Sequence, residues 1–201
     1  MPEDLFKIVR YLHEEQSLRA FRDSALLQLA FFGALRGSEI VALEISHLNW
    51  QEQGVDILIP HSKTDQTHEG QYCAIPYGDE HLCPVQALKQ WLKISALKEG
   101  PIFRRIHVNG KIEADPLVPF SVSNILRKRA QDIMHPQAAN FSSHSLRRGL
   151  ATSASRDGAS LSAIMRQGRW KNIQTVMEYI EAAQRFEENA ATSILKKLHH
   201  Q

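Results

Sequence analysis

The sequence predicts a mainly α-helical domain with one small antiparallel β-sheet, an α+β fold. Apolar residues recur at helical spacing over most of the chain. Two short runs, over residues 55–59 and 71–75, are instead typical of strands. The 201 residues, 43% of them apolar, are enough for one compact domain with a sizeable core.

Three helices are expected before the sheet. Pro2 suits the first turn of a helix that extends to about residue 15, with its apolar residues on one face. A second helix, over about 19–32, is nearly all apolar in its second half, so we expect it to be buried and Gly33 to end it. A short third helix should follow over about 38–43.

The middle of the chain predicts the sheet, a further helix and a loop. A polar stretch over 61–70 separates the two strands and should form the turn of their hairpin. The helical period returns from Pro84. Residues 104–111 predict a loop, with a turn at Asn109-Gly110.

The second half of the chain is expected to be helical. A serine hydroxyl can accept a bond from the N–H groups that a helix start leaves free, and serine stands at three expected N-caps. These are Ser121, Ser143 and Ser160. The four helices predicted here are 121–134, 143–156, 160–167 and 172–180. An amphipathic helix over about 184–198 closes the chain.

The composition argues against several classes of protein. No apolar run reaches about 18 residues, so no membrane span is expected. The acidic start lacks the apolar core of a signal peptide, so no secretion is implied and a cytoplasmic setting fits. Cys73 and Cys83 lack the close spacing of metal ligands, so we expect two reduced thiols, no metal and no cofactor.

Charge is unevenly distributed along the chain. Residues 1–100 carry nine Lys and Arg against fourteen Asp and Glu, whereas residues 101–180 carry twelve against five. A basic second half is expected of a face that binds the phosphates of nucleic acid. Charge counts alone leave an ordinary solvated basic surface equally open.

A set of widely separated side chains could attack a phosphodiester without a metal: Arg36, Lys63, His144, Arg147, Trp170 and Tyr179. H-S-L-R spans 144–147, G-R-W spans 168–170, and Tyr179 stands nine residues beyond the tryptophan. Earlier, A-L-R-G-S-E-I spans 34–40. Together these motifs resemble the catalytic domain of the tyrosine recombinases, the phage integrase family with its Cre-like and Xer-like members. The resemblance covers nearly the whole chain.

The resemblance implies the tyrosine recombinase fold and an enzyme that cleaves and rejoins DNA through a 3′-phosphotyrosyl intermediate. It also implies a cytoplasmic protein of a bacterium or phage, encoded on a mobile genetic element and associated with the nucleoid. In the family four protomers assemble on DNA, so double-stranded DNA and further copies of the chain are the expected partners.

The resemblance also sets the expected domain organisation. Relatives carry an N-terminal core-binding domain for which this chain has no room, so we expect a catalytic-domain fragment, monomeric in solution, or else a minimal form. The catalytic domain should cover 1–180. The tail over 181–201 should either dock on a neighbouring protomer or fold back on its own domain.

Two arginines are the expected phosphate-binding groups. A phosphodiester under attack gains negative charge on its non-bridging oxygens, which a planar guanidinium can hold with two parallel N–H groups. Glu39, one helical turn after Arg36, is placed to orient a catalytic side chain. Taken alone, Arg36 could form a salt bridge at a helix start, and Arg148 could serve in place of Arg147.

Tyr179 is the expected nucleophile. It needs a base, because a phenol is protonated at neutral pH. His144 lies one turn before Arg147 on a shared helix face, so we expect it to act as the general base or to donate a bond to the phosphate. Taken alone, the histidine could be a helix cap and the tyrosine a core residue.

Lys63 and Trp170 owe their expected roles to the resemblance. Lys63 lies where the family carries its catalytic lysine, and an ammonium can protonate the leaving oxygen. Trp170 stands where most relatives have histidine and Cre-like members have tryptophan, and its indole N–H can bind one phosphate oxygen. Taken alone, the lysine is a surface charge and the tryptophan a core residue. Arg148 departs from the pattern, since many relatives have histidine there.

Further contacts with DNA are expected from basic side chains near the set: Arg127, Lys128, Arg129, Arg148, Arg169 and Lys171. Two other functions stay open. A type IB topoisomerase-like enzyme would share the nucleophile and the cations. A non-catalytic DNA-binding module would share the fold alone.

Overall fold

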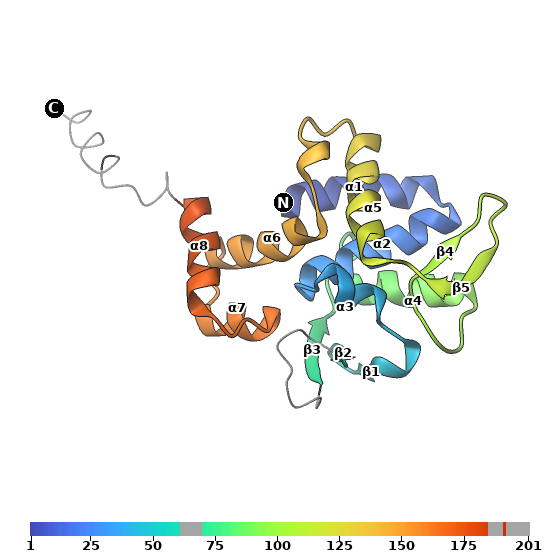
Figure 1. Ribbon diagram of the computed structural model, residues 1–201, viewed down its shortest axis with the longest axis horizontal. Helices are drawn as coiled ribbons and strands as arrows, with labels where there is room; N and C mark the ends of the chain where they lie inside the picture. The colour runs from blue at the N-terminus through green and yellow to red at the C-terminus, as the bar shows by residue number, and fades with distance from the viewer. Residues whose placement is uncertain (61–69, 185–190, 192–201) are drawn as a thin grey trace.

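The chain is mainly helical and carries two small antiparallel sheets (Figure 1). The computed structural model describes residues 1–60, 70–184 and 191. The α-helices are α1 (Pro2–Glu15), α2 (Leu18–Phe32), α3 (Gly37–Val41), α4 (Pro84–Ser95), α5 (Pro119–Asp132), α6 (Ser143–Arg156), α7 (Leu161–Gly168) and α8 (Ile173–Gln184). Two 3-10 helices are η1 (Ile45–His47) and η2 (Ala138–Asn140). The strands are β1 (Leu48–Gln51), β2 (Gly54–Ile59), β3 (Gln71–Pro76), β4 (Arg104–Ile106) and β5 (Ile112–Pro116).

Helix α2 is the centre of the larger of two hydrophobic cores. It packs against α1, α4, α5 and α6, and its Leu26, Leu27 and Leu29 are fully buried. Ser17 caps its start, because the hydroxyl oxygen accepts a bond from the Ala20 N–H at 3.0 Å. The buried helix predicted from the apolar run is therefore confirmed, and so is the amphipathic α1, which buries only its apolar face.

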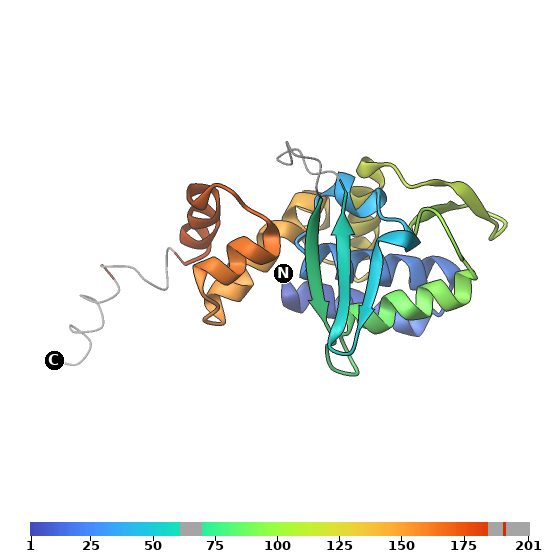
Figure 2. The ribbon, with the colours of Figure 1, turned by 90° about the horizontal axis from the view of Figure 1, so that it is seen from below.

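The larger sheet has the order β1-β2-β3 and lies against the helices, as Figure 2 shows. Its register pairs Leu48 with Ile57, and Ile57 with Cys73. Val55, Ile57 and Ile59 alternate with less buried residues along β2, so one face of the sheet joins the core. Both predicted strands are confirmed, whereas the turn between them lies outside the described residues.

The last three helices build a second, smaller core. Ala151 from α6, Ile164 from α7, and Val176 and Ile180 from α8 are buried together. Figure 1 shows α7 and α8 at one end of the molecule, with α6 joining them to the rest. The position of this end relative to α2 therefore depends on α6 and on the polar contacts that cross from α7.

Three strands were not expected from the sequence. β1 is one, and the others are β4 and β5: β4 takes residues 104–106 of the loop predicted over 104–111, and β5 begins directly after that loop. These strands lie at sheet edges and are largely exposed, so they show no alternation of apolar and polar residues. The turn at Asn109-Gly110 is nevertheless confirmed, since Gly110 takes a φ of 86°.

Two of the three expected N-caps are wrong by a short distance. α5 begins after Val118 rather than at Ser121, because a proline takes its first position. α6 begins after Ser142 rather than at Ser143, since Ser142 forms a capping box with the residue three further on. Ser160 caps α7 as expected.

The tail is described only at its start. α8 continues through residue 181, where we expected the tail to begin, and ends at Gln184. Residues 181–183 are exposed. Most of the helix predicted over 184–198 lies outside the described residues.

Candidate active site

Five of the six side chains singled out by their chemistry come from α2–α3, α6 and α7–α8 and lie near one another. Four of them are joined by direct contacts, and the charge of Arg36 is close enough to lower the pKa of both His144 and Arg147. Tyr179 Oη lies 3.0 Å from His144 Nε2. The Arg147 guanidinium stacks over the Trp170 ring, with its Cζ 4.1 Å from the ring centroid. The Trp170 and Tyr179 rings stand edge to face at 6.4 Å. Lys63 lies outside the described residues.

Helix α6 places two of these groups on one face. His144 and Arg147 are one turn apart near its start, which the capping box at Ser142 fixes. Farther along α6, Gly149 lets the helix approach α2 closely, because a Cβ there would meet Phe31 at 3.1 Å. The helix is thus pinned against α2, whose end carries the first arginine.

Arg36 stands between α2 and α3 and is held by Glu39. Its backbone N–H donates to Glu39 Oε2 at 2.9 Å, and its guanidinium Nη1 donates to Glu39 Oε1. Burial alone would raise the pKa of the Glu39 carboxyl, but Arg169 and then Arg36 lower it below its usual value. Glu39 is therefore a buried carboxylate, as expected of a group that orients Arg36.

Arg147 is buried in positive surroundings. Its Nη1 donates to the Ala34 carbonyl, whereas its Nη2 has no hydrogen-bond partner among the described residues. Burial, followed by the charge of Arg36, lowers the pKa of the Arg147 guanidinium to about 10. A buried guanidinium with an N–H group to spare is suited to an anion such as a phosphate.

His144 is poised to accept a proton. Burial, followed by the charges of Arg148, Arg147 and Arg36, lowers the pKa of its imidazole below the usual value. The ring is therefore neutral at pH 7, and a neutral imidazole has one nitrogen that can accept the phenol proton. The 3.0 Å separation from the Tyr179 oxygen is within reach for that transfer.

The ring of Trp170 is fixed by the loop that follows α7. A Cβ at Gly168 would lie 1.8 Å from the Trp170 ring, so only glycine leaves room for the indole. Arg169 between them takes the left-handed conformation, with a φ of 55°. This sharp reversal turns the indole back over Arg147.

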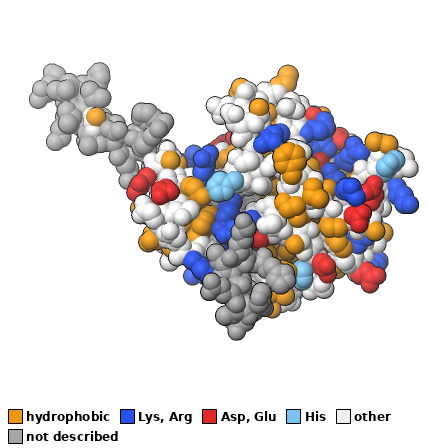
Figure 3. Space-filling view, in the orientation of Figure 1, with side chains coloured by type: hydrophobic (Ala, Val, Ile, Leu, Met, Phe, Trp, Pro, Cys, Tyr) orange, Lys and Arg blue, Asp and Glu red, His pale blue; other side chains and the backbone are white. Residues whose placement is uncertain are grey.

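Basic side chains lie over α6, α5 and the β4–β5 hairpin on the face shown in Figure 3. Arg148, in α6, is exposed. Lys128 is exposed and pairs with Asp132 at 3.2 Å, and Arg127 donates to the Phe141 carbonyl at 2.8 Å. Lys171 is exposed as well. These four remain candidates for DNA contacts.

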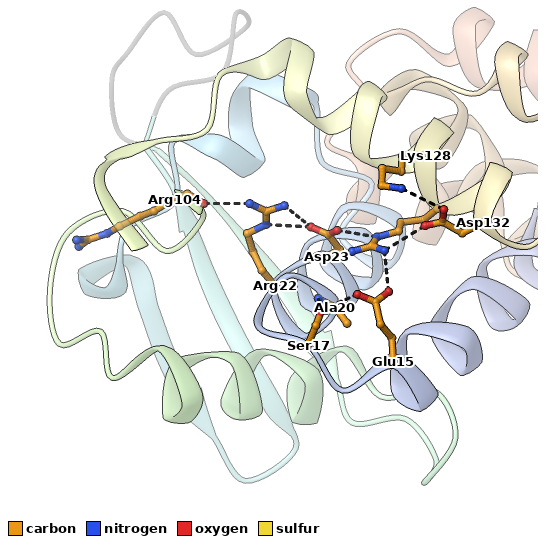
Figure 4. Close-up of polar contacts among 9 residues, drawn as sticks. Glu15, Ser17, Ala20, Arg22, Asp23, Arg104, Lys128 and Asp132 are labelled. Atoms are coloured by element: carbon orange, nitrogen blue, oxygen red, sulfur yellow. Dashed lines mark hydrogen bonds and ion pairs between the residues drawn. The ribbon is translucent and has the colours of Figure 1, made fainter. Parts of the chain in front are cut away.

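Two of the expected DNA contacts are wrong, because their side chains are buried. Arg129 donates to Asp23 and Glu15, each at 2.8 Å, in the network of Figure 4, and only 6% of its side chain is exposed. Burial alone would lower the pKa of Arg129, but Asp23 and then Glu15 raise it. Arg169 is also buried, and it bonds to Glu39 at 3.0 Å. Their partners are distant in sequence, so counts of charge could not predict either role.

One polar residue near the group had no signal in the sequence. Gln167 Nε2 donates to the Phe32 carbonyl at 2.8 Å and to the Ala74 carbonyl at 3.1 Å. It thereby ties α7 to the end of α2 and to β3. A glutamine at the end of a helix is ordinary, and only the fold gives it partners.

The described part of the chain offers neither a metal site nor a membrane span. No three His, Cys, Asp or Glu residues within it are grouped to hold a metal ion. None of its helices is long and apolar enough to cross a bilayer.

Comparison with known proteins identifies the family of the chain. Residues 2–185 match the model of the Phage integrase family. The chain is 39% identical over 187 residues to an integrase/recombinase xerD homolog of Selenomonas ruminantium, covering 92% of this chain and 54% of that protein. It is 26% identical over 189 residues to recombinase cre of Escherichia phage P1, covering 87% of this chain and 54% of the recombinase. The chain thus spans about half the length of the curated relatives it matches.

Solved structures share the fold. The XerH site-specific recombinase bound to palindromic difH substrate, a post-cleavage complex, superposes with a TM-score of 0.71 at 20% identity, over 96% of this chain and 52% of that one. A lambda integrase dimer bound to a COC′ core site gives a TM-score of 0.58 at 15% identity, over 88% of this chain and 57% of that one. The tyrosine recombinase catalytic-domain fold predicted from the sequence is confirmed.

Proposed function

Because the chain belongs to the phage integrase family, we propose that it is the catalytic domain of a site-specific tyrosine recombinase, which cleaves and rejoins double-stranded DNA. Named relatives are recombinases, and structural neighbours include recombinases bound to DNA. A DNA substrate would place the protein at the nucleoid of its host.

The observation that carries the proposal is the phenol of Tyr179 within 3.0 Å of a neutral imidazole and beside two arginines. Arg36 shares one carboxylate with a second cation, and Arg147 has an N–H group without a partner among the described residues. The group therefore carries an excess of positive charge. A phosphate is the ligand that such a group would hold most strongly.

The reaction follows from these positions. His144 Nε2 takes the proton of Tyr179 as the phenol oxygen attacks the phosphorus. Arg36 and Arg147 hold the non-bridging oxygens, where negative charge grows in the transition state. The indole of Trp170 packs over Arg147 and can bind one of these oxygens through its N–H.

The other half of the step concerns the leaving group. The bond from phosphorus to the 5′ oxygen breaks, and Lys63, on the segment between β2 and β3, gives that oxygen its proton. The product is a 3′-phosphotyrosyl bond and a free 5′-hydroxyl. A 5′-hydroxyl from another strand then reverses the step, so bond energy is retained without a cofactor.

Strand exchange requires more than one copy of the chain. We place four protomers on two DNA sites, with the tail that follows Gln184 as a connection between neighbours. Alone, the domain should bind DNA weakly and be monomeric, since the phosphate contacts of a second domain would be absent.

A nicked duplex tests the proposal, because the short strand downstream of the cleaved phosphate diffuses away and traps the covalent intermediate. Nicked duplexes tiled across the DNA that flanks the gene are incubated with the protein and separated on a denaturing gel. We expect a shifted protein band that disappears in Tyr179→Phe. Relaxation of a supercoiled plasmid without exchange between sites would favour a topoisomerase instead. Binding of these duplexes without any adduct would favour a non-catalytic module.

A further inference from the structure

We infer that Arg169 is a positioning residue, which holds Glu39 and through it sets the place and the free charge of the phosphate-binding Arg36. The inference rests on the proposed function, since Arg36 matters only if the site binds a phosphate. It replaces the expectation that Arg169 contacts DNA.

The end of α2 shows where Arg169 acts. A helix leaves its last carbonyls without helical partners, and buried carbonyls must find others. The carbonyls of residues 29–31 accept backbone N–H groups. The next three accept side-chain N–H groups from far along the chain: Phe32 from Gln167, Gly33 from Arg169 and Ala34 from Arg147. The segment that leads into Arg36 is thus clamped by the C-terminal half of the molecule.

Arg169 is the only one of these three donors in a left-handed backbone conformation, with a φ of 55°. Glycine adopts that region without strain, whereas a residue with a Cβ does so at a cost. The side chain is 4% exposed and donates to Gly33 O at 3.1 Å, to Gln167 O at 2.9 Å and to Glu39 Oε2 at 3.0 Å. A strained backbone that delivers a buried, bonded guanidinium indicates a role for that side chain beyond shape.

Glu39 transmits the effect. It is 1% exposed at the side chain, and its Oε2 accepts bonds from both Arg169 and the Arg36 backbone N–H. Its Oε1 accepts from the Arg36 guanidinium. One carboxylate is therefore shared by two cations, so it orients Arg36 without neutralising it.

Removal of Arg169 would change both the position of Arg36 and the share of its charge that is free to bind a phosphate. Glu39 would keep a single cationic partner, so its full charge would fall on Arg36 and draw the guanidinium away from the phosphate. The carboxylate would also lose the bond that fixes its own position. Because Arg169 directly precedes Trp170, the same residue sets where the second core, with Tyr179, meets α2.

The test compares Arg169→Met with Arg166→Met, which removes an exposed arginine from the last turn of α7, just before Arg169. We expect the rate of adduct formation on a nicked duplex to fall about 10- to 100-fold in Arg169→Met, because small misplacement of a catalytic group costs that much. Arg166→Met should retain the rate. In an Arg36→Lys background, Arg169→Met should cost far less, since it acts through Arg36. Equal losses in the two backgrounds would overturn the inference.

A conservative variant separates positioning from folding. Arg169→Lys keeps a cation for Glu39 but cannot make all three bonds, so it should recover most of the rate even if its thermal unfolding midpoint stays low. If the rate of adduct formation falls in proportion to the thermal unfolding midpoint in both Arg169→Met and Arg169→Lys, Arg169 has only a structural role.

A second readout needs no catalysis. Exchange of the Arg36 guanidinium protons with water, followed by nitrogen-15 NMR, should slow about tenfold in Arg169→Met, because the undivided charge of Glu39 then holds that guanidinium more tightly, and stay unchanged in Arg166→Met. Unchanged exchange in Arg169→Met would refute the positioning role. A wild-type protein that forms no adduct would instead refute the proposed function, and the exchange rates would still decide the role of Arg169.

Discussion

At the residue scale, the shared helix face of His144 and Arg147 could be predicted, whereas the roles of Arg129 and Arg169 could not. A histidine one turn from an arginine shares its helix face whatever the rest of the fold. The partners of Arg129 and Arg169 are Asp23 and Glu39, more than a hundred residues away. The sequence alone does not distinguish an arginine that is exposed to solvent from one that pairs with a buried carboxylate.

The pKa of His144 leads to a prediction about pH. Its imidazole must be neutral to act as base, and burial, followed by the charge of Arg148, lowers its pKa and so favours the neutral form. Arg148→Gln removes a charge that disfavours the imidazolium, so the pKa of His144 rises toward its usual value. The acid limb of the cleavage rate should then move to higher pH.

The measurement is the single-turnover rate of adduct formation as a function of pH, with DNA in excess. Each pH profile is divided by its own maximal rate, so that a variant's weaker DNA binding does not affect the position of the limb. Lys128→Gln, which removes an exposed charge from α5, is the matched control and should leave the limb in place. An unmoved limb in Arg148→Gln would show that a group other than His144 sets it.

The glycine before Arg169 gives a prediction about geometry. Gly168→Ala puts a Cβ where the Trp170 ring lies, 1.8 Å away, so the indole must leave Arg147. We expect cleavage to slow about 10- to 100-fold, the usual cost of misplacing a catalytic group. The rate is measured on a nicked duplex under saturating protein.

Gly158→Ala is the control for this variant. Its φ of 85° also strains a side chain, but nothing lies within 4 Å of the added Cβ. It should therefore lose stability without losing rate. A Gly168→Ala protein as fast as Gly158→Ala would mean that the position of the indole does not matter.

At the scale of elements, helices were predictable wherever one face or the whole surface is buried. α1 and α2 show a helical apolar period over many residues, so their bounds were nearly right. β1, β4 and β5 are short and exposed, and they form because a neighbouring strand offers its backbone. Such strands leave no periodic trace in the sequence.

The network around Arg129 joins three helices and predicts a stability effect. Glu15 ends α1, Asp23 lies in α2 and Asp132 ends α5, and all bond to Arg129 (Figure 4). Asp23→Ala would leave the buried Arg129 guanidinium without one of its carboxylate partners. Loss of one partner of a buried ion pair typically costs about 3–5 kcal/mol of stability.

The free energy of unfolding in denaturant measures this cost. Glu14→Ala is the control, because it breaks an exposed pair with Arg10 whose two side chains are 73% and 69% exposed, and such surface pairs contribute about 0–1 kcal/mol. If the two variants lose similar free energy, the network is not a significant source of stability.

At the scale of the whole molecule, the fold class and the gathering of five of the six candidate side chains could be predicted, but the division into two cores could not. Spacing of motifs locates residues along the chain, and resemblance implies that they meet. Nothing in the sequence separates the core around α2 from the one that holds Tyr179. That division makes the contacts from α6 and α7 to the end of α2 the determinants of the site.

The basic face is likewise a property of the whole molecule. The excess of Lys and Arg between 101 and 180 predicted a basic surface, and basic side chains do lie over α5, α6 and the β4–β5 hairpin on the face shown in Figure 3. Arg129, Arg147 and Arg169, which belong to this excess, are nevertheless buried inside the protein. Net charge along the sequence therefore overstates what the surface offers to DNA.

The measurement that tests the central claim most directly is the mapping of the covalent bond. The adduct on a nicked duplex is digested with protease and nuclease, and the linked peptide is sequenced by mass spectrometry. We predict a nucleotide joined through its 3′ phosphate to Tyr179, and a free 5′-hydroxyl on the released strand. A nucleotide joined to any other residue, or a 5′ linkage, would contradict the account.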